Sequence, residues 1–169
     1  MDLESALKTF DRSGLLTAGQ LMLLKQAMAL LAREEQAKPR QPLSDYGFVI
    51  FSAAKAYEGF LKSFFYQLGL ISRQQYGDEH WRIGRALNPD LPYRLRDETW
   101  LYDDVATTCG EKTARLWWET WRTSRNQVFH YFPDHDQWVT LGEARRAIEM
   151  IMQAIQTALV CDGRRKWLE

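Results

Sequence analysis

The hydrophobic and polar positions along most of the chain alternate with the period of an α-helix. Over residues 21–31 and 144–159, apolar side chains recur at spacings of three and four, which places them on one face of a helix. Each run follows a capping box, one beginning at Thr17 and one at Thr140, in which two side chains satisfy the first free amides of a helix. The pattern therefore predicts two amphipathic helices, each with one buried face.

The longest apolar face belongs to a segment that follows a cap at Ser44 or Asp45 and ends at Gly69. Its apolar positions at helical spacing are Ile50, Ala54, Tyr57, Leu61, Phe64 and Leu68, and the face is widened by Phe48, Phe51 and Phe65. A helix with so wide an apolar face contacts several neighbours. We therefore expect this segment to be the central helix of the fold.

A fourth long helix is predicted from Glu111 to Val128, and Pro133 follows it and stops helix propagation nearby. Shorter helices are expected over residues 2–10, 80–87 and 100–109. Candidate strands, such as residues 137–141, are ambiguous. The pattern predicts an all-α fold in which four main helices form a bundle with short helices between them.

The segment Lys38 to Pro42 contains two prolines and reads as a linker, because proline forbids helix on either side. We expect residues 1–40 to form an N-terminal helical arm. Residues 41–169 are expected to form the helical bundle, and a chain of 169 residues is long enough to bury a core without staples.

Composition narrows the class of protein. The 22 basic and 22 acidic residues balance, which argues against binding nucleic acid by bulk charge but leaves room for a local basic groove. The first residues hold no long apolar run, and no segment resembles a transmembrane helix, so a cytoplasmic protein without membrane contact is expected. Cys109 and Cys161 lie far apart without metal-ligand spacing, which predicts two reduced thiols and no metal or other cofactor.

The helix predicted to end before Pro133 carries three groups that can act on a phosphodiester: Arg125, Asn126 and His130. On an ideal helix Arg125 and His130 lie about 140° apart, whereas Asn126 and His130 lie about 40° apart. Arg125 and His130 can therefore converge on one phosphate only if the helix loosens or ends between them. The proline is expected to supply that ending.

These residues resemble a known family motif. The run Arg125-Asn126-x-x-x-His130 resembles the Arg, polar residue and His motif of HEPN-domain ribonucleases. Upstream, Tyr57-Glu58-Gly59-Phe60-Leu61-Lys62 resembles a Glu-containing helix in the HEPN domain of the RNase LS toxins. In that group a Glu on this helix joins the Arg and His at the active site, and Glu58 is the matching position. The resemblance covers roughly residues 45–159.

The resemblance implies a HEPN-like bundle and a metal-independent endoribonuclease of toxin or phage-defence type, working as a homodimer with a composite site. In that function His130 is the general acid or base, since an imidazole exchanges protons near neutral pH. Arg125 stabilises charge on the phosphoryl oxygens, and Asn126 orients the imidazole or the phosphate. Glu58 fixes the histidine tautomer, pairs with Arg125 or transfers a second proton.

Each of these residues also has an ordinary structural interpretation. Arg125 and His130 are cations at a helix C-terminus, where they interact favourably with the helix dipole. Glu58 has Lys62 four residues later, which is the spacing of a surface ion pair that contributes about 0.2–0.5 kcal/mol.

Weaker RNA contacts are predicted for Arg122, Trp118, Tyr131, Arg82 and Arg85, because arginine and aromatic side chains bind phosphates and stack on bases. A cation-π contact of Trp118 with Arg122 would hold the guanidinium side of the site. Alternatively, Trp118 is a second packing face. The arginines near residue 85 are alternatively paired with the acidic residues around them.

Two other functions fit the same sequence. One is a catalytically silent HEPN-like module that binds RNA or a partner protein. The other is a toxin silenced by modification of a tyrosine two residues after the histidine, but Phe132 holds that position here. An antitoxin protein is an expected partner whether the chain is the endoribonuclease toxin or the toxin silenced by modification. The run Asp134-His135-Asp136 is interpreted as a polar turn, because three adjacent short residues do not converge easily on one metal ion.

Overall fold

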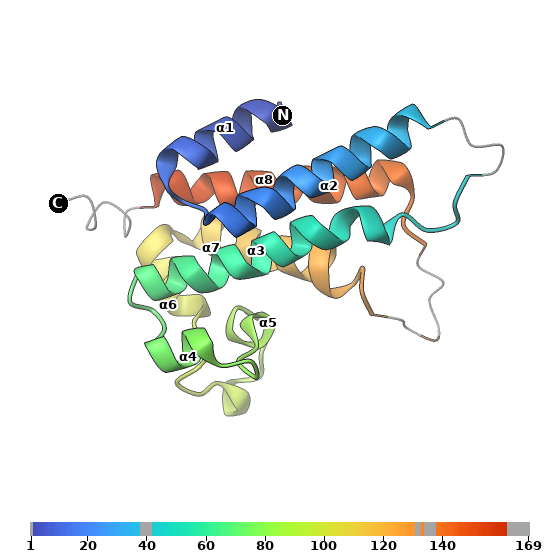
Figure 1. Cartoon of the computed structure of the whole chain (residues 1–169). Coiled ribbons are helices and arrows are strands. Elements are labelled where there is room, and N and C mark those ends of the chain that lie inside the picture. Colours follow the sequence, from blue (N-terminus) through green and yellow to red (C-terminus); the bar gives the residue numbers. More distant parts are fainter. Residues whose placement is uncertain (1, 38–41, 131–132, 134–137, 162–169) are drawn as a thin grey trace.

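The computed structural model describes residues 2–37, 42–130, 133 and 138–161 (Figure 1). All regular structure in these residues is helical, so the predicted all-α class is confirmed. The α-helices are α1 (Leu3–Ser13), α2 (Ala18–Gln36), α3 (Gly47–Gln67), α4 (Arg73–Gly77), α5 (Ile83–Ala86), α6 (Tyr102–Cys109), α7 (Glu111–Trp121) and α8 (Leu141–Thr157). Two short 3₁₀-helices are η1 (Tyr93–Leu95) and η3 (Ala158–Val160), and η2 (Arg122–Asn126) is a π-helix.

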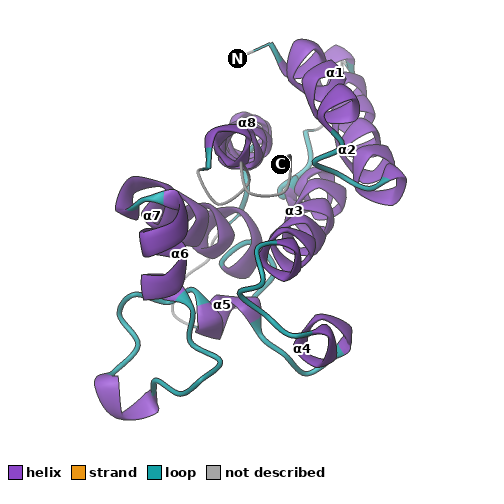
Figure 2. Ribbon diagram, turned by 90° about the vertical axis from the view of Figure 1, so that its left-hand side faces the viewer, coloured by secondary structure: helices purple, strands orange, loops and turns teal. Residues whose placement is uncertain are grey.

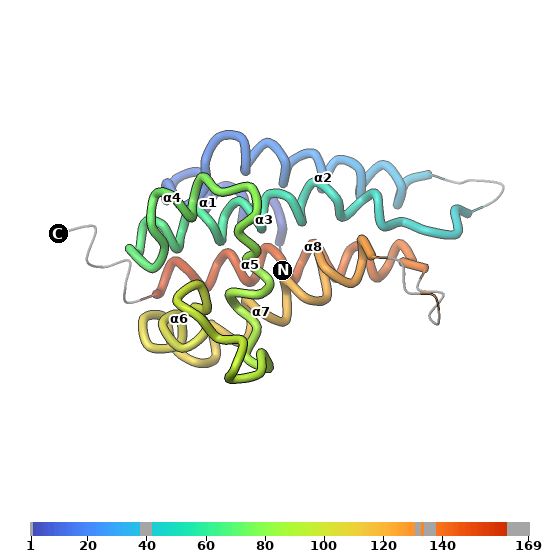
Figure 3. The backbone as a smooth tube through the Cα atoms, turned by 90° about the horizontal axis from the view of Figure 1, so that it is seen from below, coloured from blue at the N-terminus to red at the C-terminus, as the bar shows by residue number. Residues whose placement is uncertain are grey.

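Four long helices, α2, α3, α7 and α8, form the body of the molecule. In Figure 1, α3 returns antiparallel to α2, and α8 runs in the same direction as α3. Figure 2 looks nearly along these three helices and shows α3 between α2 and the α6–α7 pair. In Figure 1 the helices α4 and α5 lie below the bundle, on the side away from α1, so they are in front in Figure 3, which views the molecule from below. As predicted, α3 is central, because it contacts α2, α7, α8 and η2.

The ring of Trp117 on α7 joins the long helices in the core. It is fully buried and lies edge-on to Phe60 and Phe64, with ring centroids 6.2 and 5.5 Å away. Its Nε1 donates to the Ala154 carbonyl oxygen of α8 at 2.9 Å, and its own carbonyl accepts from the Tyr57 hydroxyl of α3 at 3.0 Å. Buried polar atoms of an aromatic core are satisfied in this way, which fixes the register of α7 against both neighbours.

Several helices begin or end at the residues predicted from capping boxes and glycine in the sequence. Both predicted capping boxes are present, at Thr17 and Thr140. After α3, Gly69 adopts a left-handed conformation (φ 71°), and the amide of Leu70 donates to the Phe65 carbonyl oxygen at 2.9 Å. That bond is the signature of a glycine-terminated helix.

Other boundaries differ from the prediction. Helix α3 begins at Gly47 with Tyr46 as its cap, and Asp45 instead accepts from the amides of Gly47 and Val139. The amide of Tyr46 also donates to the Val139 carbonyl oxygen at 2.8 Å, so the described part of the candidate strand 137–141 ties α8 to the start of α3 without forming a strand. The helix expected over residues 80–87 is only the short α5.

The N-terminal segment, predicted as an arm, packs onto the bundle. Leu7 and Phe10 of α1 and Leu24 and Leu31 of α2 are buried in the same core as α3 and α8. Helix α2 lies along α3, and α1 contacts both α2 and α8. Residues 3–36 therefore contribute a layer of the bundle in this structure.

Cys109 and Cys161 form a disulfide, so the prediction of two reduced thiols is wrong. The fold brings the end of α6 beside the end of α8, and two cysteines separated by 52 residues meet with their Cα atoms 4.6 Å apart. Sequence spacing carries no information on such a meeting, because it depends on how the helices pack. In the part of the chain described, no helix has the length and apolar character needed to cross a membrane.

Candidate active site

The helix that carries Arg125 changes form just before it reaches that residue. Helix α7 ends at Trp121, whereas an α-helix to Val128 was predicted, and the next turn is the π-helix η2. The Gln127 amide donates to the Arg122 carbonyl oxygen at 2.9 Å, five residues back. The Thr123 hydroxyl donates to the Glu119 carbonyl oxygen at 2.8 Å, and such a bond to the carbonyl four residues back loosens a helix.

Loosening therefore occurs, but its source is the π-turn and not Pro133, which lies in a turn farther along the chain. Single π-turns inside α-helices are rare and are found frequently at functional sites. The extra residue in the turn changes the direction of each side chain that follows. Arg125 and His130 consequently line one pocket, which an uninterrupted α-helix would prevent.

This pocket lies between α3 and the π-turn and has a volume of about 350 Å³. From α3 it is lined by four residues at helical spacing, and from the other wall by three residues of the motif segment. The lining residues are Phe51, Ala54, Lys55, Glu58, Arg125, Phe129 and His130. The three groups that the family resemblance selects are therefore brought together, although 67 residues separate Glu58 from Arg125.

Glu58 and Arg125 form an ion pair in which Arg125 Nε donates to Glu58 Oε2 at 2.9 Å. The two side chains are 29% and 33% exposed, so the pair is partly withdrawn from water yet open to the pocket. Lys62, the alternative partner of Glu58, lies instead over the Trp81 ring, with Nζ 5.9 Å from the ring centroid. The surface-pair interpretation of Glu58 therefore does not describe this structure.

The guanidinium of Arg125 also contacts the ring of Trp121. Its Cζ atom lies 5.6 Å from the Trp121 ring centroid, and Trp121 stacks on Trp118 with the ring planes 14° apart. The contacts with the Glu58 carboxylate and the Trp121 ring restrict the orientation of the guanidinium. The Glu58 bond uses Nε, and among the described residues no hydrogen bond joins either terminal nitrogen of Arg125 to a protein acceptor.

Asn126 and Trp118 occupy different surroundings from those predicted. Asn126 is half-buried in the π-turn and is not one of the residues that line the pocket. Trp118 is 7% exposed, which leaves almost no ring surface for a base and fits the packing interpretation. Arg122 does not lie on Trp118 but pairs with Glu119 at 2.6 Å on the surface.

The two arginines near α5 differ from each other. Arg82 is exposed at the start of α5. Arg85 bonds to Asp97 at 2.8 Å and to the Leu95 carbonyl oxygen at 2.6 Å, so it closes the loop that follows α5. Hydrogen bonds from Thr99 and from Arg85 lower the pKa of Asp97 to about 2. Tyr131, Phe132 and residues 134–136 lie outside the described residues.

Sequence reasoning missed four residues of the pocket: Phe51, Ala54, Lys55 and Phe129. Phe51 and Phe129 make an edge-to-face contact at 5.7 Å across the pocket, and both remain exposed. Lys55 stands one turn before Glu58 on the same face of α3. The spacing 51, 54, 55 and 58 marks this face, but it overlaps the hydrophobic pattern of the helix, so periodicity alone does not separate the pocket face from the packing face.

A fixed cation, a carboxylate and an imidazole on one small cavity can bind an anion and move a proton beside it. In the described residues, no group of three or more His, Cys, Asp or Glu side chains is arranged to hold a metal ion. Comparisons of the chain with family models, curated proteins and solved structures found no match.

Proposed function

We propose that the chain is a metal-independent endoribonuclease of toxin or phage-defence type, with its active site in the Glu58–Arg125–His130 pocket. The observation that carries the proposal is the ion pair between Glu58 and Arg125 on the wall of a pocket that His130 also lines. An ion pair across 67 residues, at the positions that resemble the HEPN motif, is hard to ascribe to a helix cap.

The proposed reaction needs few groups. The RNA 2′-hydroxyl gives up its proton as its oxygen attacks the adjacent phosphorus, the bond from phosphorus to the 5′-oxygen breaks, and the leaving 5′-oxygen takes up a proton to become a hydroxyl. The products are a 2′,3′-cyclic phosphate and a 5′-hydroxyl end, and DNA is spared because it lacks the nucleophile. Arg125 neutralises the charge that develops on the phosphoryl oxygens.

His130 transfers the proton in this proposal, and Glu58 is a positioning residue that aims Arg125 through its Nε atom. Lys55 adds a second cation at the pocket for the neighbouring phosphate. Asn126, Tyr131, Arg122 and Arg82 stay candidates for RNA contact on the sequence argument alone.

A homodimer is part of the proposal, because the family resemblance implies two motifs facing one composite cleft. The exposed rings of Phe51 and Phe129 at the pocket rim supply an apolar surface of the kind a second copy covers. An antitoxin and a cytoplasmic location belong to the same proposal. The Cys109–Cys161 disulfide counts against that location, since the cytosol keeps most thiols reduced.

The decisive experiment is incubation of the purified chain with mixed cellular RNA in excess chelator, with its oligomeric state measured in the same buffer. We expect cleavage, with cyclic-phosphate ends and with no cut where the attacking 2′-hydroxyl is replaced by hydrogen. His130→Ala should lower the rate by about 10²–10⁴-fold, the usual contribution of a general acid or base.

Glu58→Gln tests the positioning role, and Glu35→Gln is its matched control. Glu35 pairs with Arg145 at 2.6 Å with similar exposure, but on the α2 and α8 surface. Glu58→Gln should slow cleavage by about tenfold or more, because one charge-assisted hydrogen bond contributes about 1.5–3 kcal/mol. Glu35→Gln should cleave at the rate of the unmodified chain.

The second candidate is a catalytically silent module that binds RNA or a protein, and the exposed Phe51 and Phe129 rings favour it. Titration with RNA separates the two. A confirmed dimer that binds RNA and leaves it intact would rule out the nuclease in favour of the module. A His130→Ala variant that cuts as fast as the parent would instead show that His130 does not transfer the proton and that the proposed active site is wrong.

A further inference from the structure

Two aromatic rings border the Glu58–Arg125 pocket and take no part in the chemistry proposed there. Phe51 of α3 is 57% exposed, and Phe129, in the turn after η2, is 38% exposed. Their ring centroids lie 5.7 Å apart with the planes at 86°, and both rings line the pocket. Single exposed apolar residues are ordinary in proteins, but these two contact each other at the edge of a cationic pocket. The pair therefore offers a surface to a flat apolar group.

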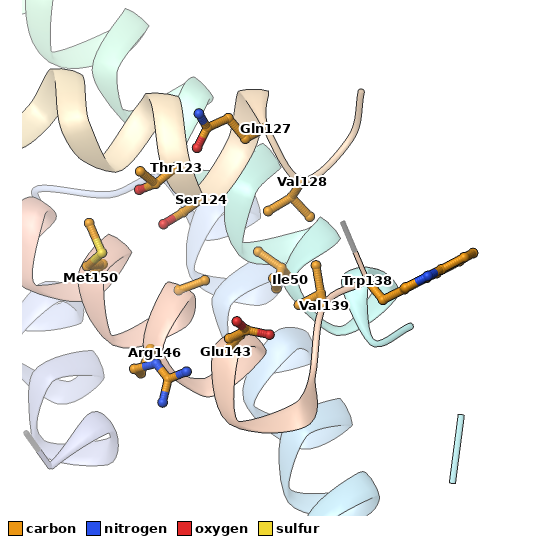
Figure 4. A pocket seen from close by; sticks show the side chains of 11 residues that line it. Ile50, Thr123, Ser124, Gln127, Val128, Trp138, Val139, Glu143, Arg146 and Met150 are labelled. Carbon is orange, nitrogen blue, oxygen red and sulfur yellow. The ribbon is translucent and has the colours of Figure 1, made fainter. Parts of the chain in front are cut away.

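The residues that directly precede these two rings serve the core instead. Ile50 is fully buried, and with Val128 it lines a separate cavity between η2 and α8 (Figure 4). Phe51 and Phe129 line the other pocket, beside Glu58 and Arg125. Adjacent residues of a helix are turned by about 100° from each other, so the burial of Ile50 leaves Phe51 outside the packed interior. Packing of the core therefore does not explain the two phenylalanines.

Charged groups continue from the rings along the same face of α3. Lys55 stands one turn after Phe51, and Glu58, which holds Arg125 by its Nε atom, follows about one turn later. With a rise of 1.5 Å per residue, Phe51 and Glu58 lie about 10 Å apart along the helix axis. Lys55 is exposed and belongs to none of the described ion pairs. The pocket thus has a guanidinium at one end, two rings at the other and an ammonium group between them.

This arrangement matches the parts of a nucleotide. An inorganic phosphate would engage the cations and leave the rings uncovered, whereas an apolar ligand would cover the rings and leave the cations without an anion. A nucleotide carries a phosphate and a flat base that its sugar holds apart, so it reaches both ends of the pocket. Proteins that bind single strands combine cations along the backbone with aromatic side chains on which bases stack.

We propose that Phe51 and Phe129 form a stacking platform for an unpaired base next to the phosphate that Arg125 binds. The inference rests on the proposed function for that phosphate, and it adds the base and its binding residues. Phe129 directly precedes His130, so a base on the platform lies beside the group that transfers the proton. Lys55 binds the neighbouring phosphate of the strand. Stacking accepts every base, so the platform selects an unpaired base and not a sequence.

The test measures binding without cleavage. Two short fluorescent strands of 2′-deoxynucleotides are titrated with the full chain at fixed salt, one carrying thymine at every position and one without bases. Neither strand can be cut, because both lack the attacking 2′-hydroxyl. The thymine strand should bind about five- to 150-fold more tightly, the usual contribution of one stacked base. Equal affinity for the two strands, or no saturable binding of either, would overturn the proposal.

Variants locate the base. Phe51→Ala should lower the affinity for the thymine strand toward that for the abasic strand, and Phe51→Tyr should restore it, because the ring is kept. Lys55→Gln should weaken both strands by the same factor, because it removes a phosphate contact. Two controls should bind like the parent: Phe48→Ala, on the same helix, 40% exposed and outside the pocket lining, and Trp138→Ala, at the cavity in Figure 4.

The oligomeric state of each variant is measured in the same buffer. A base preference that survives in Phe51→Ala, or disappears in Trp138→Ala, would place the base elsewhere and contradict the assignment. A Phe51→Ala chain that loses its dimer and keeps the base preference would assign the rings to contact between copies. The platform and the nuclease fail separately: a preference that depends on Phe51 in a chain that leaves RNA intact keeps the platform alone, whereas cleavage of RNA without any base preference keeps the nuclease alone.

Discussion

At the scale of single residues, Arg125 is held by one partner remote in sequence and one local partner. Glu58 lies 67 residues away and Trp121 one turn before it, and both contact the guanidinium of Arg125, which lines the pocket. The motif itself could be read from the sequence, because its residue types and spacing resemble a family. The choice of Arg125 over Lys62 as the partner of Glu58 could not be read from the sequence, since both cations can pair with a carboxylate by charge alone.

Arg85 and Asp97 give a residue-scale prediction on pH. The pKa of Asp97 is lower in the folded protein than its ordinary value of 3.8, so its contacts stabilise the fold above that value, and the contribution is lost as the pH falls through about 2. Arg85→Gln should raise this pKa part of the way toward 3.8, because the Thr99 hydrogen bonds remain. Carboxyl-carbon NMR of Asp97 against pH measures the change.

Arg94→Gln is the control for that titration, since Arg94 lies in the same loop on η1. In the Arg94→Gln variant, the pKa of Asp97 should remain about 2. An equal rise in both variants would mean that general loop charge, and not the Arg85 bond, sets the pKa.

At the scale of elements, the π-turn and its neighbour α5 decide where the site lies. Thr123 and Ser124 are short polar residues in a helix that is otherwise rich in tryptophan, and they mark the place where α7 gives way to η2. Helix α5 lies so close to the end of α7 that a Cβ atom added at Gly84 would overlap the Trp121 ring, and the Arg125 guanidinium lies over the same ring. Helix α4 begins with a further capping box, Ser72 to Gln75, which is also a signal in the sequence.

Gly84→Ala is predicted to destabilise the protein by about 1–3 kcal/mol, the usual cost of forcing a methyl group into a packed site. The added Cβ would overlap the Trp121 ring, so the ring and the guanidinium above it must shift. Urea unfolding measures the loss, and tryptophan fluorescence of the native state reports the displaced ring.

Gly77→Ala is the matched control at the end of α4, where a Cβ meets no atom within 4 Å. It should stay within about 0.5 kcal/mol of the parent, as surface substitutions do. A Gly84→Ala variant as stable as Gly77→Ala would show that α5 and Trp121 are not in contact in solution.

At the scale of the whole molecule, α1 and α2 complete a layered bundle that the Cys109–Cys161 disulfide closes at one end. The core runs without interruption from Phe10 through Trp117 to Ile148. The disulfide ties α6 to the end of α8 and so fixes the α6–α7 pair against the bundle. It also bears on the compartment, because such bonds persist mainly in oxidising surroundings.

Removal of the disulfide by Cys109→Ser together with Cys161→Ser should lower the free energy of unfolding by about 4 kcal/mol, the chain-entropy value for a loop of this length. The loop is set by the 52-residue separation of the two cysteines. Urea unfolding of the oxidised parent and of the double variant measures the difference. A reductant should lower the urea midpoint of the parent and leave that of the double variant unchanged.

Mass spectrometry after alkylation gives the direct check. Without reductant, the denatured parent should take up no alkyl group, and after reduction it should take up two. Alkylation of both cysteines before any reduction would show that the thiols are reduced, as the sequence predicts, and would contradict the disulfide.

The sequence by itself determined the all-α class, the central position of α3, the two capping boxes and the glycine that ends α3. These features depend on residues within about one turn of each other, through local hydrogen bonds and helical periodicity. Tertiary structure alone decided the Glu58–Arg125 pair, the Cys109–Cys161 bond and the contact of Phe51 with Phe129. Each joins residues that approach one another only when helices pack, and the energy of packing belongs to the assembled core and not to any one segment.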